Sequence, residues 1–306
     1  MTVPAPRRLG FGAAALAAAA VLLAACGSTD TSDSGAADSG GSDGPDRIVS
    51  LSPSATETLF AVGAGDQVVA VDELSDFPAD APVTDLSGYT PNIEAILGFE
   101  PDLVLGADLD ADVVSGLERV GVEVLDQPAP QTVAEAYDQI EQIGAATGHV
   151  GGAAEVVSEI TERIDAAVSA APQAAGLTYY HELDESLYTA TGDTFIGQIY
   201  ALFGLENIAG ADIGGITYPQ LQAEQVITDD PDLIFLADTQ CCGVTAESVA
   251  ERPGWADITA VERGDVFSLD EDIASRWGPR IAELVEQIGA LLAALPAPET
   301  AGGPVG

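Results

Sequence analysis

The sequence predicts an α/β protein whose two Rossmann-like lobes are joined by a single long backbone helix, with a ligand cleft between the lobes. Three observations carry this prediction. Short apolar segments alternate with helical ones, which is the order of parallel sheets built from βα units. One helix–turn–strand phrase occurs twice, at 92–105 and 221–235, and a long amphipathic segment lies between the two copies.

Residues 1–25 predict an export signal rather than a part of the fold. Arg7 and Arg8 precede an apolar run from 9 to 25 that is too short and too rich in Ala for a membrane span. The run ends in Leu-Ala-Ala-Cys-Gly, which resembles a bacterial lipobox and predicts lipidation of Cys26. The alternative is an ordinary signal peptide with an incidental cysteine, and the paired arginines also fit twin-arginine export.

The next segment, 26–45, begins with that cysteine and then contains only Gly, Ser, Thr, Asp, Ala and Pro. These residues have too little apolar surface to order the chain, so we expect a flexible linker. A lipidated cysteine followed by a linker predicts an extracytoplasmic protein that is held at the cell membrane by its lipid anchor alone. Such a protein is separated from cytoplasmic ATP and NAD, and we expect no cofactor.

The first predicted lobe spans 46–149. It opens with an apolar strand at 47–51, and a helix follows whose start is marked by Ser and Thr caps and by an acidic residue of the first turn, Glu57. Glycines at 63 and 65 end this helix, and a second strand at 67–71 completes a βα unit.

The repeated phrase indicates an internal duplication at the scale of a lobe. Each copy is a helix, a Pro-Asp turn and a buried strand, and Pro101 and Pro231 stand 130 positions apart, as do Glu94 and Glu224. The alternative is that this phrase is common among α/β proteins. The matched spacing of the two glutamates favours duplication.

Residues 150–172 predict the linking helix. Apolar residues recur at a spacing of four from Val156 to Val168, charged residues lie between them, and a proline stops the helix. A single helix between two lobes restricts their motion, so we expect only modest opening and closing. The second lobe then spans 173–296, and we expect a disordered tail at 297–306.

Composition excludes several classes of function. Asp and Glu number 50 against 9 Lys and Arg, and the net charge of −41 repels phosphate backbones, so we expect no nucleic-acid partner. A hydrophobic content of 47% excludes wholesale disorder. Two histidines cannot supply a three-His metal site, and we expect none. The acidity indicates either a salt-tolerant or GC-rich source or compositional drift.

Ligands of doubly wound folds bind outside the carboxyl ends of the strands, so we expect the ligand between the two lobes. The sequence has no nucleophile elbow, phosphate loop or zinc-protease motif, and we expect no enzyme. A secreted cleft enzyme is the remote alternative. His181 stands at a strand end, where a structural role and a ligand contact are both open.

Other residues near the strand ends are candidates for ligand contact. Tyr89 and Tyr218 precede the duplicated helices and predict either an aromatic clamp on a flat ligand or two turn tyrosines. Cys241 and Cys242 are adjacent, and the alternatives are a vicinal disulfide, two free thiols or contact with a metal. Trp277 is expected near the cleft, with a core position as the alternative.

From about 46 to 295 the sequence resembles the Fe/B12 periplasmic-binding family, the substrate-binding proteins of ABC importers. Six segments carry the resemblance: Ile-Val-Ser-Leu-Ser-Pro-Ser-Ala-Thr-Glu at 48–57, Ser-Asp-Phe-Pro at 75–78, Asn-Ile-Glu at 92–94, Phe-Glu-Pro-Asp-Leu-Val at 99–104, Tyr-Pro-Gln-Leu at 218–221 and Pro-Arg-Ile at 279–281. The family fold, two α/β lobes bridged by a long helix, agrees with the elements predicted above.

The resemblance is greatest to the vitamin B12-binding member of the family. It implies that Asp272 and Arg276 stand where that member has an Asp-x-x-x-Arg pair before Pro-Arg-Ile, and that Tyr218 stands at its cleft aromatic. Leu74 and Tyr89 fall on or beside its first-lobe aromatics. For the Asp272–Arg276 pair, a surface ion pair and a support for closure of the lobes are the alternatives to ligand contact.

The family also implies a transport partner. In it, the positions of Glu94 and Glu224 dock an ABC permease dimer that works with its ATPase; the alternative is two solvated carboxylates. The protein itself is expected to be a monomer. The expected ligand contacts are Ser52, Pro53, Leu74, Tyr89, Tyr218, Cys241, Cys242, Asp272, Arg276 and Trp277.

Charge guides the expected ligand. The chain is poor in cations, which disfavours a strongly anionic ferric tricatecholate and favours a nearly neutral corrinoid or a neutral or cationic hydroxamate siderophore. A ferric hydroxamate siderophore or haem is the alternative ligand, although haem binding needs His or Tyr at the iron and only tyrosines stand in the first-lobe cleft.

Overall fold

The computed structural model describes residues 44–171, 174–211 and 215–296. The predicted export signal, Cys26, nearly all of the linker, Pro172 and the tail at 297–306 lie outside the described residues. The described part belongs to one compact unit, Ser42–Gly306. It contains two parallel sheets flanked by helices, so the predicted α/β fold class is confirmed.

The first sheet has the strand order β3-β2-β1-β4-β5, and all its pairings are parallel. Its strands are β1 Ile48–Ser50, β2 Val68–Asp72, β3 Val83–Leu86, β4 Leu103–Gly106 and β5 Glu123–Asp126. Its helical segments are α1 Pro53–Val62, η1 Gly65–Gln67, α2 Ile93–Leu97, α3 Ala111–Glu118 and α4 Val133–Thr147.

Helix α1 begins and ends where its sequence predicts. The side chain of Ser52 accepts a hydrogen bond from the backbone of Ala55, and Pro53 is the first helical residue. Gly63 closes the helix with a φ of 97°, a left-handed conformation that suits glycine. The prediction for Glu57 is wrong, because the helix starts at Pro53 and its first turn holds no acidic residue.

The second sheet has the order β7-β6-β8-β9 and is also parallel. Its strands are β6 Thr178–Glu182, β7 Glu206–Asn207, β8 Leu233–Leu236 and β9 Val266–Ser268. Its helical segments are α6 Phe195–Ala201, α7 Ala223–Asp229, α8 Thr239–Cys242, α9 Ala246–Ala250, η2 Trp255–Asp257, α10 Thr259–Arg263, α11 Glu271–Ala274 and α12 Ile281–Ala294. In this order β6, β7, β8 and β9 take the places of β1, β2, β4 and β5.

The two lobes also repeat one hydrogen-bonding device. The carboxylate of Asp102 accepts from the backbone N–H of Arg47, just before β1, at 3.0 Å. The carboxylate of Asp232 accepts from the backbone N–H of Thr178, the first residue of β6, at 3.0 Å. Each aspartate of the Pro-Asp phrase therefore fixes the start of the neighbouring strand, which supports the predicted internal duplication.

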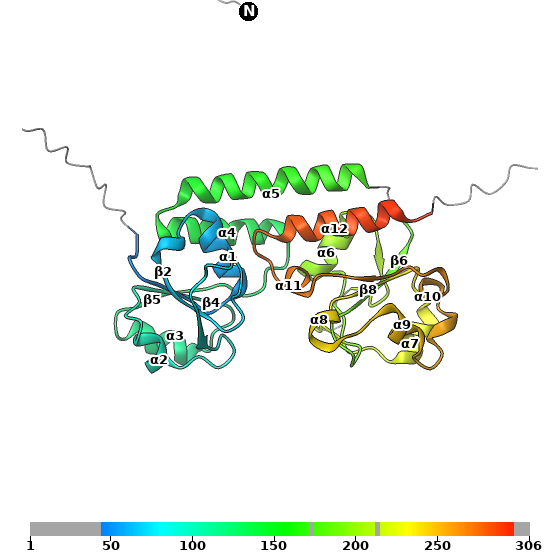
Figure 1. Ribbon diagram of the computed structural model, residues 1–306, viewed down its shortest axis with the longest axis horizontal. Coiled ribbons are helices and arrows are strands. Elements are labelled where there is room, and N and C mark those ends of the chain that lie inside the picture. Colours follow the sequence, from blue (N-terminus) through cyan, green and yellow to red (C-terminus); the bar gives the residue numbers. More distant parts are fainter. Residues whose placement is uncertain (1–43, 172–173, 212–214, 297–306) are drawn as a thin grey trace, which may run out of the picture. The chain divides into compact units, whose positions relative to one another are not determined.

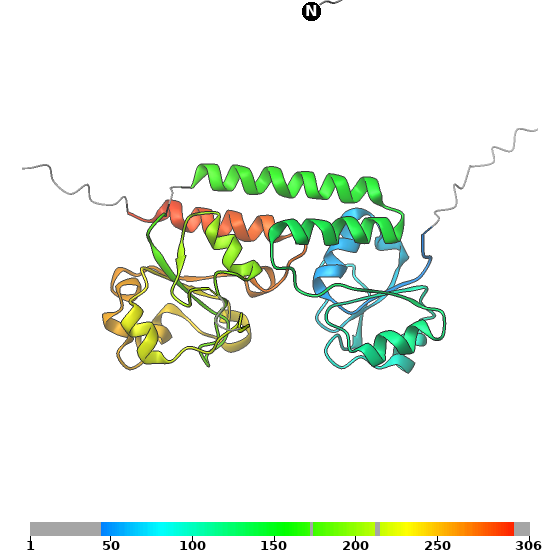
Figure 2. The same ribbon diagram turned by 180° about the vertical axis from the view of Figure 1, so that it is seen from behind.

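The linking helix is α5, Val150–Ala170, as the apolar spacing predicts. Figure 1 shows α5 running alongside α4 and α12, and Figure 2 shows the same helical layer from behind. One hydrophobic core lies beneath this layer and draws on both lobes, since it contains Ile48 and Leu59, Ile160 of α5, and Tyr179 and Phe235. No helix in the described ranges is long and apolar enough to cross a membrane.

On the other face of each sheet the lobes have separate cores. Val49 and Val104 belong to a core of the first lobe, and Ile234 and Leu236 belong to a core of the second. Successive residues of a strand thus point into different cores, as the pleat requires. The central strands β1, β4, β6 and β8 are almost wholly buried, so their functional side chains are confined to the strand ends and the loops that follow them.

Candidate functional site

A buried polar network organises the strand ends of the first lobe. The hydroxyl of Thr56 on α1 lies 2.8 Å from that of Ser50 at the end of β1, and 2.9 Å from that of Ser75. Ser75 in turn donates to the carboxylate of Asp72, the last residue of β2. Burial raises the pKa of Asp72, and the hydrogen bond from Ser75 opposes that rise. The network ties the loop after β2 to α1 and β1.

This loop presents apolar side chains to solvent. Leu74 and Phe77 are each 45% exposed, although Ser75 between them is fully buried. Gly88 comes so close that a Cβ there would lie 2.4 Å from the backbone oxygen of Leu51, so only glycine fits. Tyr89, the next residue, is 85% exposed. The first lobe therefore exposes three large apolar side chains in the loops after its strands, Leu74, Phe77 and Tyr89, which together are called its apolar face below.

The second lobe carries a comparable face. The backbone of Thr189 donates to Pro219, that of Thr191 donates to Thr217, and Tyr188 pairs with Gln220 in an isolated antiparallel bridge. The pairing brings together Tyr188 and Tyr218, which are each 41% exposed, and Ile216 is exposed as well. Phe77 belongs to the segment 72–77 that was expected from the sequence to line the cleft. Tyr188 and Ile216 were not predicted; the available signal was a large apolar residue beside each predicted loop.

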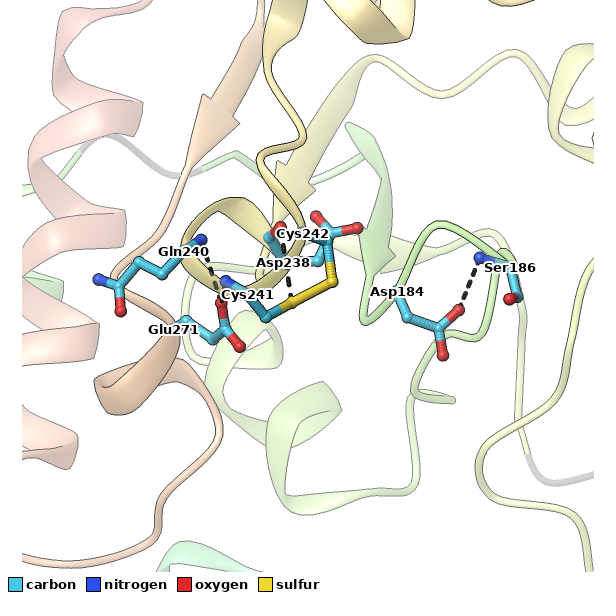
Figure 3. Close-up of a disulfide and its surroundings, with 7 residues drawn as sticks. All are labelled: Asp184, Ser186, Asp238, Gln240, Cys241, Cys242 and Glu271. Atoms are coloured by element: carbon cyan, nitrogen blue, oxygen red, sulfur yellow. Dashed lines mark hydrogen bonds between the residues drawn. A yellow bond between two sulfur atoms is a disulfide. The ribbon is translucent and has the colours of Figure 1, made fainter. Parts of the chain in front are cut away.

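Cys241 and Cys242 are joined by a disulfide in the short helix α8, so among the sequence-based alternatives the vicinal disulfide is the one present. Figure 3 shows it with Glu271, whose carboxylate accepts from the backbone N–H groups of Gln240 and Cys241 at 3.1 and 2.9 Å. Both cysteines are exposed. They lie just after β8, at the carboxyl end of the second sheet.

A fully buried acidic pair lies at the strand ends of the second lobe, with Glu182 at the end of β6 and Asp238 just before α8. Both carboxylate oxygens of Glu182 accept from Arg252 at 2.6 Å, and this guanidinium also lies 4.7 Å from the ring centre of Trp255. Neither carboxylate oxygen of Asp238 has a donor among the described residues. Burial first, and then the neighbouring Glu182, raise the pKa of Asp238 to about 7.

His181 is buried in the shared core rather than exposed to a ligand. Its Nδ1 lies 2.8 Å from the hydroxyl of Tyr200. Burial lowers the pKa of His181 to about 4, so the ring is neutral near pH 7. Of the two roles left open by the sequence, the geometry favours the structural one.

Asp272 and Arg276 do pair, at 2.7 Å, but Arg276 also reaches the first lobe. It donates to the carboxylate of Glu57 at 3.1 Å and to the backbone oxygen of Leu74 at 3.1 Å, and it lies 3.4 Å from Asp76. Its side chain is only 10% exposed. The guanidinium thus joins the two lobes, which is the support role considered beside ligand contact.

Trp277 and the start of α1 meet at the same junction. The backbone N–H of Trp277 donates to the hydroxyl of Ser54 at 3.1 Å, and the ring packs against the shared core. Together with Ser52 they line a cavity of about 10 Å³, which has room for one water molecule. Ser52 and Pro53 act here as helix cap and first helical residue.

Glu94 and Glu224 occupy the second positions of α2 and α7 and are both exposed. Neither takes part in an ion pair with another described residue. The duplication thus gives each lobe one free carboxylate at an equivalent place.

A larger cavity of about 450 Å³ lies at the loop between β5 and α4. It is lined by Asp126, Gln127, Pro128, Ala129, Pro130, Gln131, Glu135, Asp138, Gln139 and Gln142. No predicted ligand contact lines it. Among the described residues there is also no group of His, Cys, Asp and Glu side chains that could hold a metal ion.

These features define the chemistry that the strand ends can support. Both lobes expose large aromatic or aliphatic side chains near their strand ends, while the nearby Arg276 and Arg280 are already paired with Glu57. Such surfaces suit a broad ligand of low net charge, held by apolar contact and a few polar groups.

Comparisons with known proteins agree on one family. The periplasmic binding protein model matches residues 48–273. An uncharacterized ABC transporter substrate-binding lipoprotein of Bacillus subtilis is 31% identical over 302 residues, which cover 90% of this chain and 94% of the relative. A cobalamin-binding protein of Halobacterium salinarum is 32% identical over 254 residues, which cover 78% of this chain and 67% of the relative.

Among solved structures, a periplasmic haem-binding protein of Vibrio cholerae superposes with a TM-score of 0.72 at 25% identity, covering 80% of this chain and 98% of that one.

Proposed function

The chain belongs to the periplasmic binding protein family, and from this premise we propose that it is the substrate-binding lipoprotein of an ABC importer that captures a corrinoid. One relative is named as an ABC transporter substrate-binding lipoprotein and another as a cobalamin-binding protein, which supports a carrier rather than an enzyme. The observation that carries the corrinoid assignment is the similarity to a cobalamin-binding protein over 254 residues.

The two apolar faces support this ligand. A corrinoid is broad, flat and rimmed with amides, so it needs aromatic contact and a few polar partners. Tyr89 on the first lobe and Tyr188 and Tyr218 on the second provide exposed rings. The exposed disulfide of Cys241 and Cys242 adds a polarizable surface at the carboxyl end of the second sheet.

Glu94 and Glu224 are the proposed docking residues for the permease. A two-fold permease presents the same basic pocket twice, and the two lobes offer one exposed carboxylate each at equivalent helix positions. Cys26 is the proposed lipid anchor, supported by the name of the Bacillus relative.

Titration calorimetry with cyanocobalamin tests the proposal. We expect heat of binding with the wild type and an affinity loss of about 1–2 kcal/mol, roughly fivefold to thirtyfold, in Tyr218→Ala. Val150→Ala removes an exposed apolar side chain from α5, away from the strand ends, and serves as the matched control with unchanged affinity.

Haemin and ferrioxamine are titrated in parallel. Tight binding of either one, with no heat from cyanocobalamin, would reject the corrinoid and retain the carrier. A wild type that binds none of the three would reject the proposed ligand classes altogether.

A further inference from the structure

Glu57 is a buried carboxylate whose partners come from the opposite end of the chain. It stands on α1 in the first lobe, and its side chain is 1% exposed. One of its oxygens accepts from Arg276 at 3.1 Å and from Arg280 at 2.7 Å. An unpaired carboxylate would be costly at this depth, so the two arginines are required for its burial.

Each arginine also holds part of the apolar face on the first lobe. Arg276 donates to the backbone oxygen of Leu74 at 3.1 Å. Arg280 stacks over the ring of Phe77, with 4.3 Å between guanidinium carbon and ring centre. Glu57 therefore binds both of the arginines that contact these two exposed residues.

The same arginines fix the second lobe against the first. Arg276 is bound at 2.7 Å by Asp272, which belongs to α11 of the second lobe. The chain from 276 to 280 passes so close to α1 that a Cβ on Gly278 would lie 3.2 Å from a Glu57 oxygen and 3.1 Å from the backbone oxygen of Ser54. The junction leaves little room for another arrangement of these residues.

We propose that Glu57 is a positioning residue for ligand binding, which acts through Arg276 and Arg280 to hold the apolar face of the first lobe in register with the second lobe. The affinity measurement that tests this inference rests on the corrinoid-carrier function proposed above. A second measurement, of tryptophan accessibility, needs no ligand.

The test compares Glu57→Gln with Glu286→Gln. Gln keeps the shape of the side chain but removes the charge that both arginines require. Glu286 also pairs with an arginine, Arg163, at 2.8 Å, but that pair joins α12 to α5 and its glutamate is 43% exposed. We expect cyanocobalamin affinity to fall about tenfold to a hundredfold in Glu57→Gln and to stay unchanged in Glu286→Gln.

A double-mutant cycle separates positioning from a general loss of structure. If Glu57 acts through Arg276, the loss caused by Glu57→Gln is at least about threefold smaller in an Arg276→Ala background than in the wild type. Equal losses in both backgrounds would overturn the inference. Should Glu57→Gln not fold, Glu57→Asp keeps the charge but shortens the side chain, and we expect the same loss of affinity; an unchanged affinity would overturn the inference.

The second measurement is acrylamide quenching of tryptophan fluorescence, and it uses the position of Trp277 next to Arg276. The chain has only 2 tryptophans, Trp255 and Trp277. Acrylamide quenching of the Trp277→Phe variant therefore reports on Trp255 alone, and the rest of the quenching in the full protein belongs to Trp277. We expect Trp277 to become more accessible to acrylamide in Glu57→Gln and not in Glu286→Gln. If the wild type binds no corrinoid, the proposed ligand is rejected, but the quenching measurement still tests the positioning role of Glu57. Unchanged quenching in Glu57→Gln would overturn that role.

Discussion

Asp238→Asn should remove a pH dependence of stability that the wild type carries. Asp238 lies two residues after the end of β8 with 0% exposure, and neither of its oxygens receives a hydrogen bond from a described residue. The neighbouring carboxylate, Glu182, is already held by Arg252. A protonated Asp238 is therefore the form that the folded protein favours, and Asn imitates that neutral form without titrating.

The magnitude follows from the pKa of Asp238, which burial and then Glu182 raise from 3.8 to about 7. Between these values the folded chain holds a proton that the unfolded chain has released, so the free energy of unfolding falls as pH rises. The contribution of Asp238 to the free energy of unfolding is fully present below about pH 4 and is lost above about pH 7. It amounts to about 4 kcal/mol.

His181 contributes with the opposite sign. Burial lowers its pKa from 6.5 to about 4, so its contribution is complete above pH 6.5 and is lost as pH falls toward 4. The pH profile of the wild type alone is therefore a sum of opposing terms. The difference between wild type and variant isolates Asp238.

Urea denaturation at fixed ionic strength measures this difference. From about pH 5 to about pH 8 the stability of the wild type relative to Asp238→Asn should fall by about 2–3 kcal/mol. Asp80→Asn is the control, because Asp80 is exposed and makes no side-chain hydrogen bond with another described residue, and it should show no such change. A pH-independent difference between wild type and Asp238→Asn would refute the assignment of a protonated Asp238.

Three further predictions concern the transporter, the anchor and the junction of the lobes. Joint Glu94→Ala and Glu224→Ala substitution should abolish uptake by cells while leaving cyanocobalamin affinity intact; normal uptake would refute docking, and lost affinity would assign the residues to the ligand site. Cys26→Ser should lose metabolic labelling with a fatty-acid analogue, and retained label would reject the anchor. Gly278→Ala should destabilise the protein by about 1–3 kcal/mol in urea, because the new Cβ meets the backbone oxygen of Ser54; an unchanged midpoint would show that the junction can relax.

Features that depend on short stretches of chain were predictable from the sequence. The cap at Ser52, the stop at Gly63 and the linking helix at 150–170 follow from local hydrogen bonding and apolar spacing. The duplication was visible because each copy keeps the same Pro-Asp turn, whose aspartate fixes a neighbouring strand in both lobes.

Features that depend on distant partners were not predictable. Strand β3, Val83–Leu86, is mostly exposed and lacks an apolar run, so only its pairing with β2 defines it. Glu57 was expected to serve the start of its helix, yet its partners Arg276 and Arg280 lie more than 200 positions along the chain. Tyr188 became a candidate only through its bridge to Gln220.

The identity of the ligand that the purified protein retains tests the central claim most directly. The protein is mixed with equal amounts of cyanocobalamin, ferrioxamine and haemin, and unbound compounds are removed by gel filtration. Absorbance and mass of the retained compound then identify it. We predict that cyanocobalamin is retained and the other two are lost; retention of haemin or ferrioxamine in its place, or of no compound, would contradict the corrinoid-carrier function.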